Sequence, residues 1–79
     1  MMGDRLTGKV TFIKRQRGYG FLRDDNRKMD WFFPAVELPE NSFNDLQLGD
    51  TLSFLGVLDN KQRNKAIEIQ IEKEIHNEN

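Results

Sequence analysis

Two aromatic rings at alternate positions follow a basic residue in residues 17–22, Arg-Gly-Tyr-Gly-Phe-Leu. Side chains on a β-strand alternate between faces, so Tyr19 and Phe21 are expected to point the same way, about 7 Å apart. That separation suits two successive unstacked nucleobases. Glycines at positions 18 and 20 leave the backbone open to close approach by a bulky ligand. These residue types predict a surface on which bases stack.

The same segment matches the ribonucleoprotein pattern of single-stranded RNA readers as far as Phe21, with Leu22 in place of valine. The alternative is that Tyr19 and Phe21 form the core face of a half-buried strand, since apolar rings usually lie inside. Seven of the eight aromatic residues fall between Phe12 and Phe43, and aliphatic residues elsewhere can supply a core. This segregation favours a stacking surface beside a basic groove.

Positive charge is concentrated in the first third of the chain, although the net charge is −1. Residues 1–28 contain eight Lys and Arg against three Asp, whereas residues 29–79 contain four basic and ten acidic residues. Such a chain can attract a polyanion locally while it remains near-neutral overall. The expected phosphate contacts are Lys9, Lys14, Arg15 and Arg17.

Composition disfavours several other classes of function. The 79 residues include no cysteine, which removes disulfides and thiolate chemistry and fits a reducing cytoplasm. No apolar run approaches the roughly 18 residues of a membrane span. Asp24 and Asp25 point to different sides of a strand end and form no acid–base pair, and His76 lies in a polar tail. We expect no enzyme activity, no cofactor or metal, and no membrane or small-molecule partner.

Hydrophobic alternation predicts five short strands, at residues 6–13, 18–23, 30–33, 51–58 and 65–72. Strict alternation places Val10 and Phe12 on one face of the first strand. Pro34, which lacks a backbone donor, stops the third strand, and a single helical turn is expected at residues 36–38. Five strands without a substantial helix predict an all-β, five-stranded antiparallel barrel, because closure removes exposed edges. The missing helices exclude an RNA-recognition-motif domain.

The predicted core is mostly aliphatic. In the last strand, Ile67, Ile69 and Ile71 are expected inside, and the alternating Glu68, Gln70 and Glu72 outside. Trp31 and Phe33 lie on the opposite face from Phe32 and are expected in the core. The remaining core positions are Leu6, Val10, Leu22, Leu46, Leu52, Phe54 and Val57. One domain is expected over residues 1–74, followed by a frayed tail at residues 75–79.

The order of these segments resembles the bacterial cold-shock domain family. That family opens with Gly-Lys-Val and aromatics, continues with Lys-Gly-Phe/Tyr-Gly-Phe-Ile and Asp-Val-Phe-Val-His-Phe, and ends with two further strands. Here the first two blocks are residues 8–10 and 17–22, and the later ones follow in order and spacing at residues 30–35, 49–54 and 66–69. The resemblance implies an OB-type barrel that binds single-stranded RNA or DNA on surface rings.

The resemblance also implies a set of binding residues. Phe12 stands where the family usually has a tryptophan, and Pro34 and Ala35 replace its His-Phe pair. The resemblance assigns the ligand contacts to Phe12, Tyr19, Phe21, Phe32, Phe43, Arg17 and Arg63.

The leading hypothesis is therefore a monomeric, non-catalytic module that holds single-stranded RNA or DNA. The alternative is an OB-type protein-interaction module whose nucleic-acid motif has degenerated, which the loss of the His-Phe pair favours.

Overall fold

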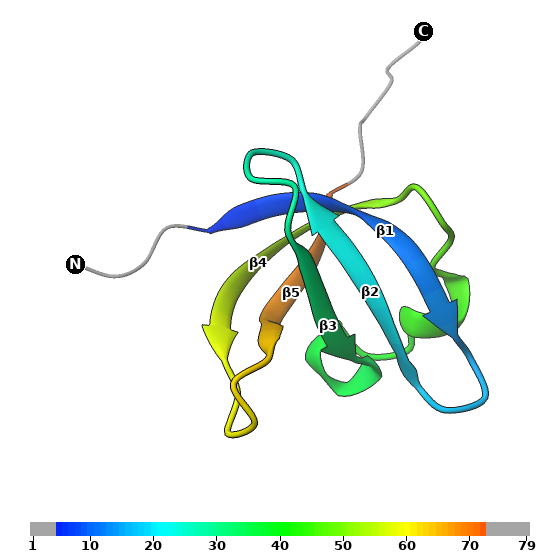
Figure 1. Cartoon of the computed structure of the whole chain (residues 1–79). Helices are drawn as coiled ribbons and strands as arrows, with labels where there is room; N and C mark the ends of the chain where they lie inside the picture. The colour runs from blue at the N-terminus through cyan, green and yellow to red at the C-terminus, as the bar shows by residue number, and fades with distance from the viewer. Residues whose placement is uncertain (1–4, 73–79) are drawn as a thin grey trace, which may run out of the picture.

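Five strands close into a barrel in the computed structural model, which describes residues 5–72 (Figure 1). The strands are β1 (Leu6–Lys14), β2 (Tyr19–Asp24), β3 (Asp30–Pro34), β4 (Thr51–Leu58) and β5 (Asn64–Glu72), in the spatial order β1-β2-β3-β5-β4. The predicted five-stranded all-β barrel is confirmed, and all five predicted strands exist. The tail expected at residues 75–79, with His76, lies outside the described residues.

The barrel is not antiparallel throughout, because β3 and β5 pair in parallel at Phe32 and Lys65. The chain path explains this correction. The consecutive strands β1, β2 and β3 reverse at each turn, so β3 runs parallel to β1. β4 is antiparallel to β1, and β5 is antiparallel to β4, so β5 also runs parallel to β1. β3 and β5 meet when the barrel closes, and their pairing must be parallel.

Two short 3-10 turns, η1 (Ala35–Glu37) and η2 (Phe43–Asp45), lie in the connection between β3 and β4. The first confirms, one residue earlier, the helical turn expected at residues 36–38, whereas the second was not predicted. Within residues 5–72 neither turn, nor any other helix, is long and apolar enough to cross a membrane.

The core lies inside the barrel and contains both aromatic and aliphatic side chains. Trp31 and Phe33 are buried, as their alternation with Phe32 predicts. Val57 is 37% exposed and so is not the core residue expected. The buried apolar residues are Val10, Leu22, Trp31, Phe33, Leu38, Leu46, Leu52, Phe54, Ala66 and Ile69.

A β-bulge in β1 separates Phe12 from Val10. Val10 pairs with Leu22 and Phe12 pairs with Phe21, so Thr11 is an extra residue on β1. An extra residue reverses the alternation beyond it. Val10 is buried and Phe12 is 44% exposed. The prediction that they share a face is therefore wrong, and the bulge turns Phe12 outward beside Phe21.

A second bulge changes the alternation in β5. Glu68 has a φ of 51° where the β4–β5 register shifts, and its amide donates to the Glu37 carboxylate at 2.9 Å. Before the bulge Ala66 is buried and Ile67 is only half-buried, whereas Ile69 after the bulge is buried again. The expected inward position of Ile67 is wrong, because Ala66 takes it.

The glycines at positions 18 and 20 have roles other than ligand access. Gly18 closes the β1–β2 turn with a φ of 74°, which side chains disfavour. Gly20 is buried, and a Cβ atom there would lie 2.7 Å from the Phe33 ring and 2.5 Å from the Phe12 carbonyl oxygen. Gly20 thus makes room for the core on the inner side of β2, while the rings at 19 and 21 stay outside.

Candidate nucleic-acid interface

The outer face of β1, β2 and β3 is ordered as three rows of residues that run across the strands. The registers place each outward residue of β2 between a partner on β1 and a partner on β3. The central row is aromatic, one flanking row joins a lysine to a tyrosine and a proline, and the other flanking row is charged. The rows are Phe12, Phe21 and Phe32; Lys14, Tyr19 and Pro34; and Lys9, Arg23 and Asp30.

Four rings on these rows form one continuous cluster, here called the aromatic face: Phe12, Tyr19, Phe21 and Phe32. Tyr19 and Phe21 lie on the same face, as predicted, with their ring centroids 6.2 Å apart. Phe32 lies 5.6 Å from Tyr19 and 5.9 Å from Phe21, and Phe12 lies 6.1 Å from Phe21. The aromatic face is partly open to solvent, since Phe12 is exposed and the other three rings are half-buried.

The rings of the aromatic face are tilted against one another. Tyr19 and Phe21 meet at 84° and Phe21 and Phe32 at 67°, which are edge-to-face contacts. A planar ligand that lies flat on one ring therefore cannot lie flat on the next in the same orientation. Such a surface suits bases that are separated from one another, as in a single strand, better than the parallel stack of a duplex.

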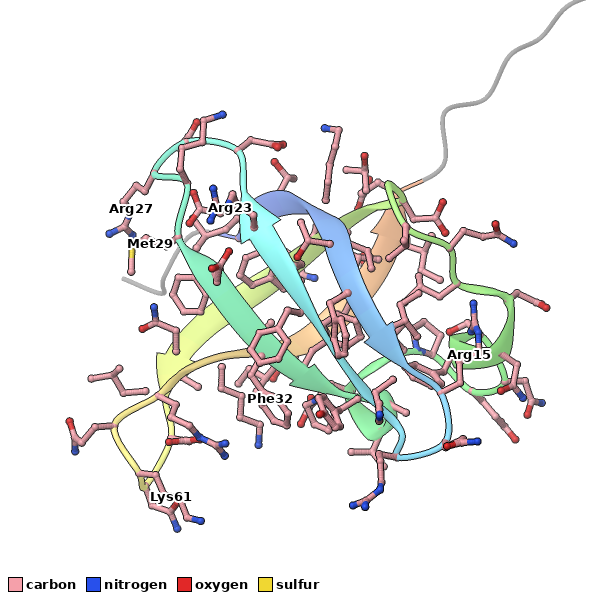
Figure 2. The ribbon with its side chains drawn as sticks, turned by 45° about the vertical axis from the view of Figure 1, so that its right-hand side comes forward. Arg15, Arg23, Arg27, Met29, Phe32 and Lys61 are labelled. Carbon is pink, nitrogen blue, oxygen red and sulfur yellow. The ribbon has the colours of Figure 1, made fainter. Side chains whose placement is uncertain are left out.

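The predicted basic residues have different surroundings. Within residues 5–72 the side chains of Lys14 and Arg17 make no ion pair or hydrogen bond. Lys9 lies 3.5 Å from the Asp25 carboxylate. Arg15 donates to the carbonyl oxygens of Phe43, at 2.9 Å, and of residues 44 and 46, so it fixes the η2 loop against the β1–β2 turn (Figure 2).

Phe43 does not join the aromatic face. It is half-buried and packs against the core from η2, and it makes no close ring pair within the described residues. It lines a separate shallow groove with Val36 of η1 and Leu38, the residue that follows η1.

Arg63 reaches the aromatic face from the loop between β4 and β5. Its guanidinium carbon lies 4.9 Å from the centroid of Phe32, a cation–π distance. The Asp59 carboxylate accepts hydrogen bonds from the Arg63 amide at 2.9 Å and from its side chain at 2.8 Å. The bond from the Arg63 amide is the main reason that the pKa of Asp59 lies below its ordinary value. Asp59 thus holds the Arg63 guanidinium over the ring of Phe32.

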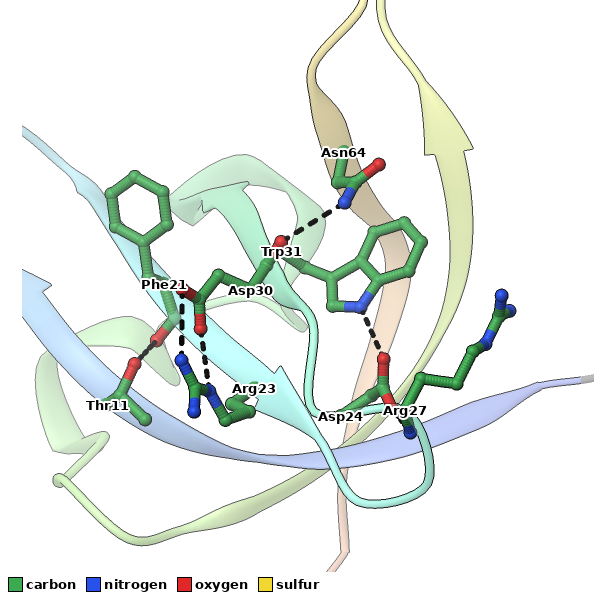
Figure 3. Close-up of polar contacts among 8 residues, drawn as sticks. All are labelled: Thr11, Phe21, Arg23, Asp24, Arg27, Asp30, Trp31 and Asn64. Atoms are coloured by element: carbon green, nitrogen blue, oxygen red, sulfur yellow. Dashed lines mark hydrogen bonds and ion pairs between the residues drawn. The ribbon is translucent and has the colours of Figure 1, made fainter.

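The charged row borders a hollow at one end of the aromatic face. We call it the Arg23 hollow; it is lined by Thr11, Phe12, Phe21, Arg23 and Asp30. Arg23 donates to the two carboxylate oxygens of Asp30, at 2.9 and 3.4 Å (Figure 3). This hydrogen bonding raises the pKa of Arg23 above its ordinary value. Alternation along β2 puts Arg23 on the face of Tyr19 and Phe21, but the pair with Asp30 was not predicted from the sequence.

A buried carboxylate supports the loop between β2 and β3. Asp24 accepts hydrogen bonds from the indole Nε1 of Trp31 at 2.9 Å and from the Arg27 amide at 2.5 Å (Figure 3). Burial raises the pKa of Asp24, but these hydrogen bonds outweigh it, and the net pKa is below the ordinary 3.8. Asp24 is therefore structural. In the described part of the chain no three His, Cys, Asp or Glu side chains gather in a way that could hold a metal ion.

Comparison with known proteins places most of this chain in one family. Residues 6–72 match the family described as the 'cold-shock' DNA-binding domain, and this match covers most of the chain. The chain therefore belongs to the cold-shock domain family, whose fold is a nucleic-acid-binding OB-type barrel. The resemblance proposed from the sequence is confirmed.

Individual relatives are similar over most of this chain. Cold shock domain-containing protein 4 of Arabidopsis thaliana is 31% identical over 67 residues, which are 85% of this chain and 33% of that protein. Cold shock protein 1 of the same plant is 26% identical over 65 residues, 82% of this chain and 22% of that protein. A solved structure of Drosophila Unr CSD456 superposes with a TM-score of 0.72 at 27% identity, covering 89% of this chain and 27% of that one. The chain spans a third or less of each.

Proposed function

We propose that this domain binds single-stranded RNA or DNA without catalysis, by stacking unpaired bases on the aromatic face. The observation that carries the proposal is the cluster of Phe12, Tyr19, Phe21 and Phe32, which is partly open to solvent and adjoins the basic β1–β2 turn. A stacking surface beside positive charge is the usual means of binding single strands with little sequence preference.

The expected affinity is moderate. Each stacked base contributes on the order of 1–3 kcal/mol, as judged by alanine substitution. Three or four such contacts, offset by the cost of ordering the strand, correspond to binding at about micromolar concentration. That affinity would let the domain hold RNA unpaired and release it again, as an RNA chaperone does. Because one barrel supplies all four rings, we propose that it acts as a monomer.

The basic residues divide into two groups in this proposal. Lys14 and Arg17 are free to meet phosphates along the Tyr19 side of the aromatic face. Arg15 positions the η2 loop with its bonds to carbonyl oxygens. Arg63, held over Phe32, is placed to contact the strand where it passes that ring.

A titration with a labelled oligonucleotide tests the proposal. The intrinsic fluorescence of Trp31 is a poor probe, because the indole is buried on the opposite side of β3 from Phe32. Fluorescence anisotropy of labelled heptathymidine should instead show saturable binding, and the same sequence annealed to its complement should bind much more weakly. Equal binding to the duplex would contradict a stacking mechanism.

The affinity for single strands should depend only modestly on salt concentration. If Lys14, Arg17 and Arg63 each engage one phosphate, these contacts give a slope of about −2 for log K against log salt concentration. The double variant Lys14→Gln/Arg17→Gln should reduce the steepness by about 1.4, the value for two phosphate contacts. The measurement is a set of anisotropy isotherms from low to moderate salt. A slope steeper than about −6 would mean that electrostatics, and not stacking, dominates.

Placing the His-Phe pair of the family pattern at positions 34 and 35 should extend the aromatic face by one ring and one hydrogen-bond donor. Pro34 pairs with Tyr19 at the end of its row, and Ala35 begins η1; both are half-buried. The double variant Pro34→His/Ala35→Phe should gain one stacked base, which corresponds to roughly 5- to 150-fold tighter binding. Isotherms at one salt concentration measure the gain, and circular dichroism checks the fold. If the folded double variant gains no affinity, the bound oligonucleotide does not pass over positions 34 and 35.

A further inference from the structure

The Arg23 hollow differs from the rest of the aromatic face because it offers directional hydrogen-bond donors beside a ring. Arg23 is the next outward residue after Phe21 on β2, and its pair with Asp30 forms one wall of the hollow. Both side chains of the pair are about half exposed, at 52% and 55%. A base that stacks on Phe21 or Phe12 in this hollow would have its edge beside the guanidinium.

Asp30 fixes the orientation of the guanidinium and leaves part of it free. Nε and one N–H of Nη2 bond the two oxygens of Asp30. An arginine side chain has five N–H donors, so three remain, on Nη1 and Nη2. These two nitrogens form the outer edge of a rigid planar fork, which matches two adjacent acceptor atoms.

The pairing also makes Arg23 a weak phosphate site. Asp30 cancels the charge of Arg23, and a phosphate placed there would be repelled by the carboxylate. Lys9, the other basic residue of the charged row, is likewise paired with an acidic residue, Asp25. By contrast, Lys14 and Arg17 at the other end of the aromatic face have no acidic partner in the described structure. Arg23 is thus better suited to read a neutral base edge than to bind the backbone.

We propose that the Arg23 hollow binds guanine, with Nη1 and Nη2 of Arg23 donating to its O6 and N7 atoms and Asp30 acting as a positioning residue. This inference rests on the proposed function, and it adds a base preference to it. Guanine presents O6 and N7 as two adjacent acceptors, whereas adenine has a donor beside N7 and thymine has only O4 on that edge. A good bidentate contact discriminates between bases by about 5- to 150-fold.

A set of labelled heptanucleotides tests the inference. In heptathymidine, one thymine is replaced by guanine, adenine or cytosine at each position in turn, and binding is measured by anisotropy. We expect at least one position where guanine improves affinity over thymine by about 5- to 150-fold. At that position hypoxanthine, which keeps O6 and N7, should bind as guanine does, and 7-deazaguanine, which lacks N7, should lose most of the gain.

Two variants connect the preference to the fork. Arg23→Lys keeps the charge and loses the fork, so the ratio of guanine to thymine affinities should fall to nearly 1. Arg27→Gln is the control in the neighbouring loop: the Arg27 side chain makes no hydrogen bond or ion pair within residues 5–72, and the ratio should keep its parental value. Circular dichroism verifies that both variants fold.

The outcomes separate the two proposals. If no oligonucleotide binds the parent, the proposed function itself fails. If heptathymidine binds but no position favours guanine, only the guanine assignment is overturned. An equal gain in affinity with cytosine would also overturn the guanine assignment, because cytosine lacks the O6 and N7 acceptors. A guanine preference that survives in Arg23→Lys would overturn it as well, because another residue would then be responsible.

Discussion

The double variant Tyr19→Ala/Phe21→Ala should weaken binding to heptathymidine by at least about 30-fold, which corresponds to two stacked bases at the lower limit of 1 kcal/mol each. Phe21 contacts the other three rings of the aromatic face, so its loss also removes support from Phe12 and Phe32. Each single variant should bind heptathymidine about 5- to 150-fold more weakly than the parent. Anisotropy titration at constant salt measures all three.

The fold should survive these changes, because both side chains are outward and only half-buried. The matched control is Leu58→Ala, which removes an exposed apolar side chain at the end of β4, with 61% of Leu58 accessible. It should bind with parental affinity. The assignment of the aromatic face is wrong if the double variant remains folded and binds heptathymidine as the parent does.

Asp24→Ala should lower the free energy of unfolding by about 2–4 kcal/mol. The substitution leaves the buried Trp31 indole without an acceptor, at about 1–3 kcal/mol, and also the part-buried Arg27 amide, at about 1 kcal/mol because water can reach it. The total free energy of unfolding of a domain of this size is only about 4–12 kcal/mol. Urea unfolding at neutral pH measures the loss. The control is the neighbouring Asp25→Ala, whose exposed partners at 3.2 and 3.5 Å should be worth about 1 kcal/mol or less.

The stabilisation from Asp24 should depend on pH. Because its pKa is lowered in the folded protein, the unfolded chain takes up this proton first as the pH falls. The contribution is therefore complete well above the ordinary value of 3.8 and is lost as the pH falls from there through the folded pKa. Asp24→Asn should be less stable than the parent at pH 7, and the difference should shrink at pH 3. A difference that grows on acidification would contradict the role given to Asp24.

The strands were predictable because their residues alternate, and the inward positions of Trp31 and Phe33 follow from the same rule. The two bulges were not predictable, because an extra residue at Thr11 or Glu68 breaks the alternation without a glycine or proline to mark it. The first bulge matters for the binding site. Without it, Phe12 would share the inner face of Val10, and with it the Phe12 ring lies on the outer face beside Phe21.

The binding residues were predicted unevenly. Tyr19, Phe21 and Phe32 lie together because their spacing within strands and the pairing of β2 with β3 agree. The surroundings of charged residues depend on the three-dimensional fold, so sequence could not show that Arg15 bonds carbonyls of η2 or that Lys9 faces Asp25. Alternation along β2 predicts that Arg23 shares the face of Phe21, but its pair with Asp30 also depends on the pairing of β2 with β3.

Single-stranded nucleic acid should bind on the outer face of β1, β2 and β3. An NMR titration of the isotope-labelled protein with heptathymidine tests it directly, by following backbone amide and aromatic ring signals. We expect the largest shifts at Phe12, Tyr19, Phe21 and Phe32, with smaller ones at Lys14 and Arg17. Shifts confined to the groove of Val36 and Phe43 or to the outer side of β4, or no shifts at all at millimolar oligonucleotide, would contradict it and favour a protein-interaction role for this barrel.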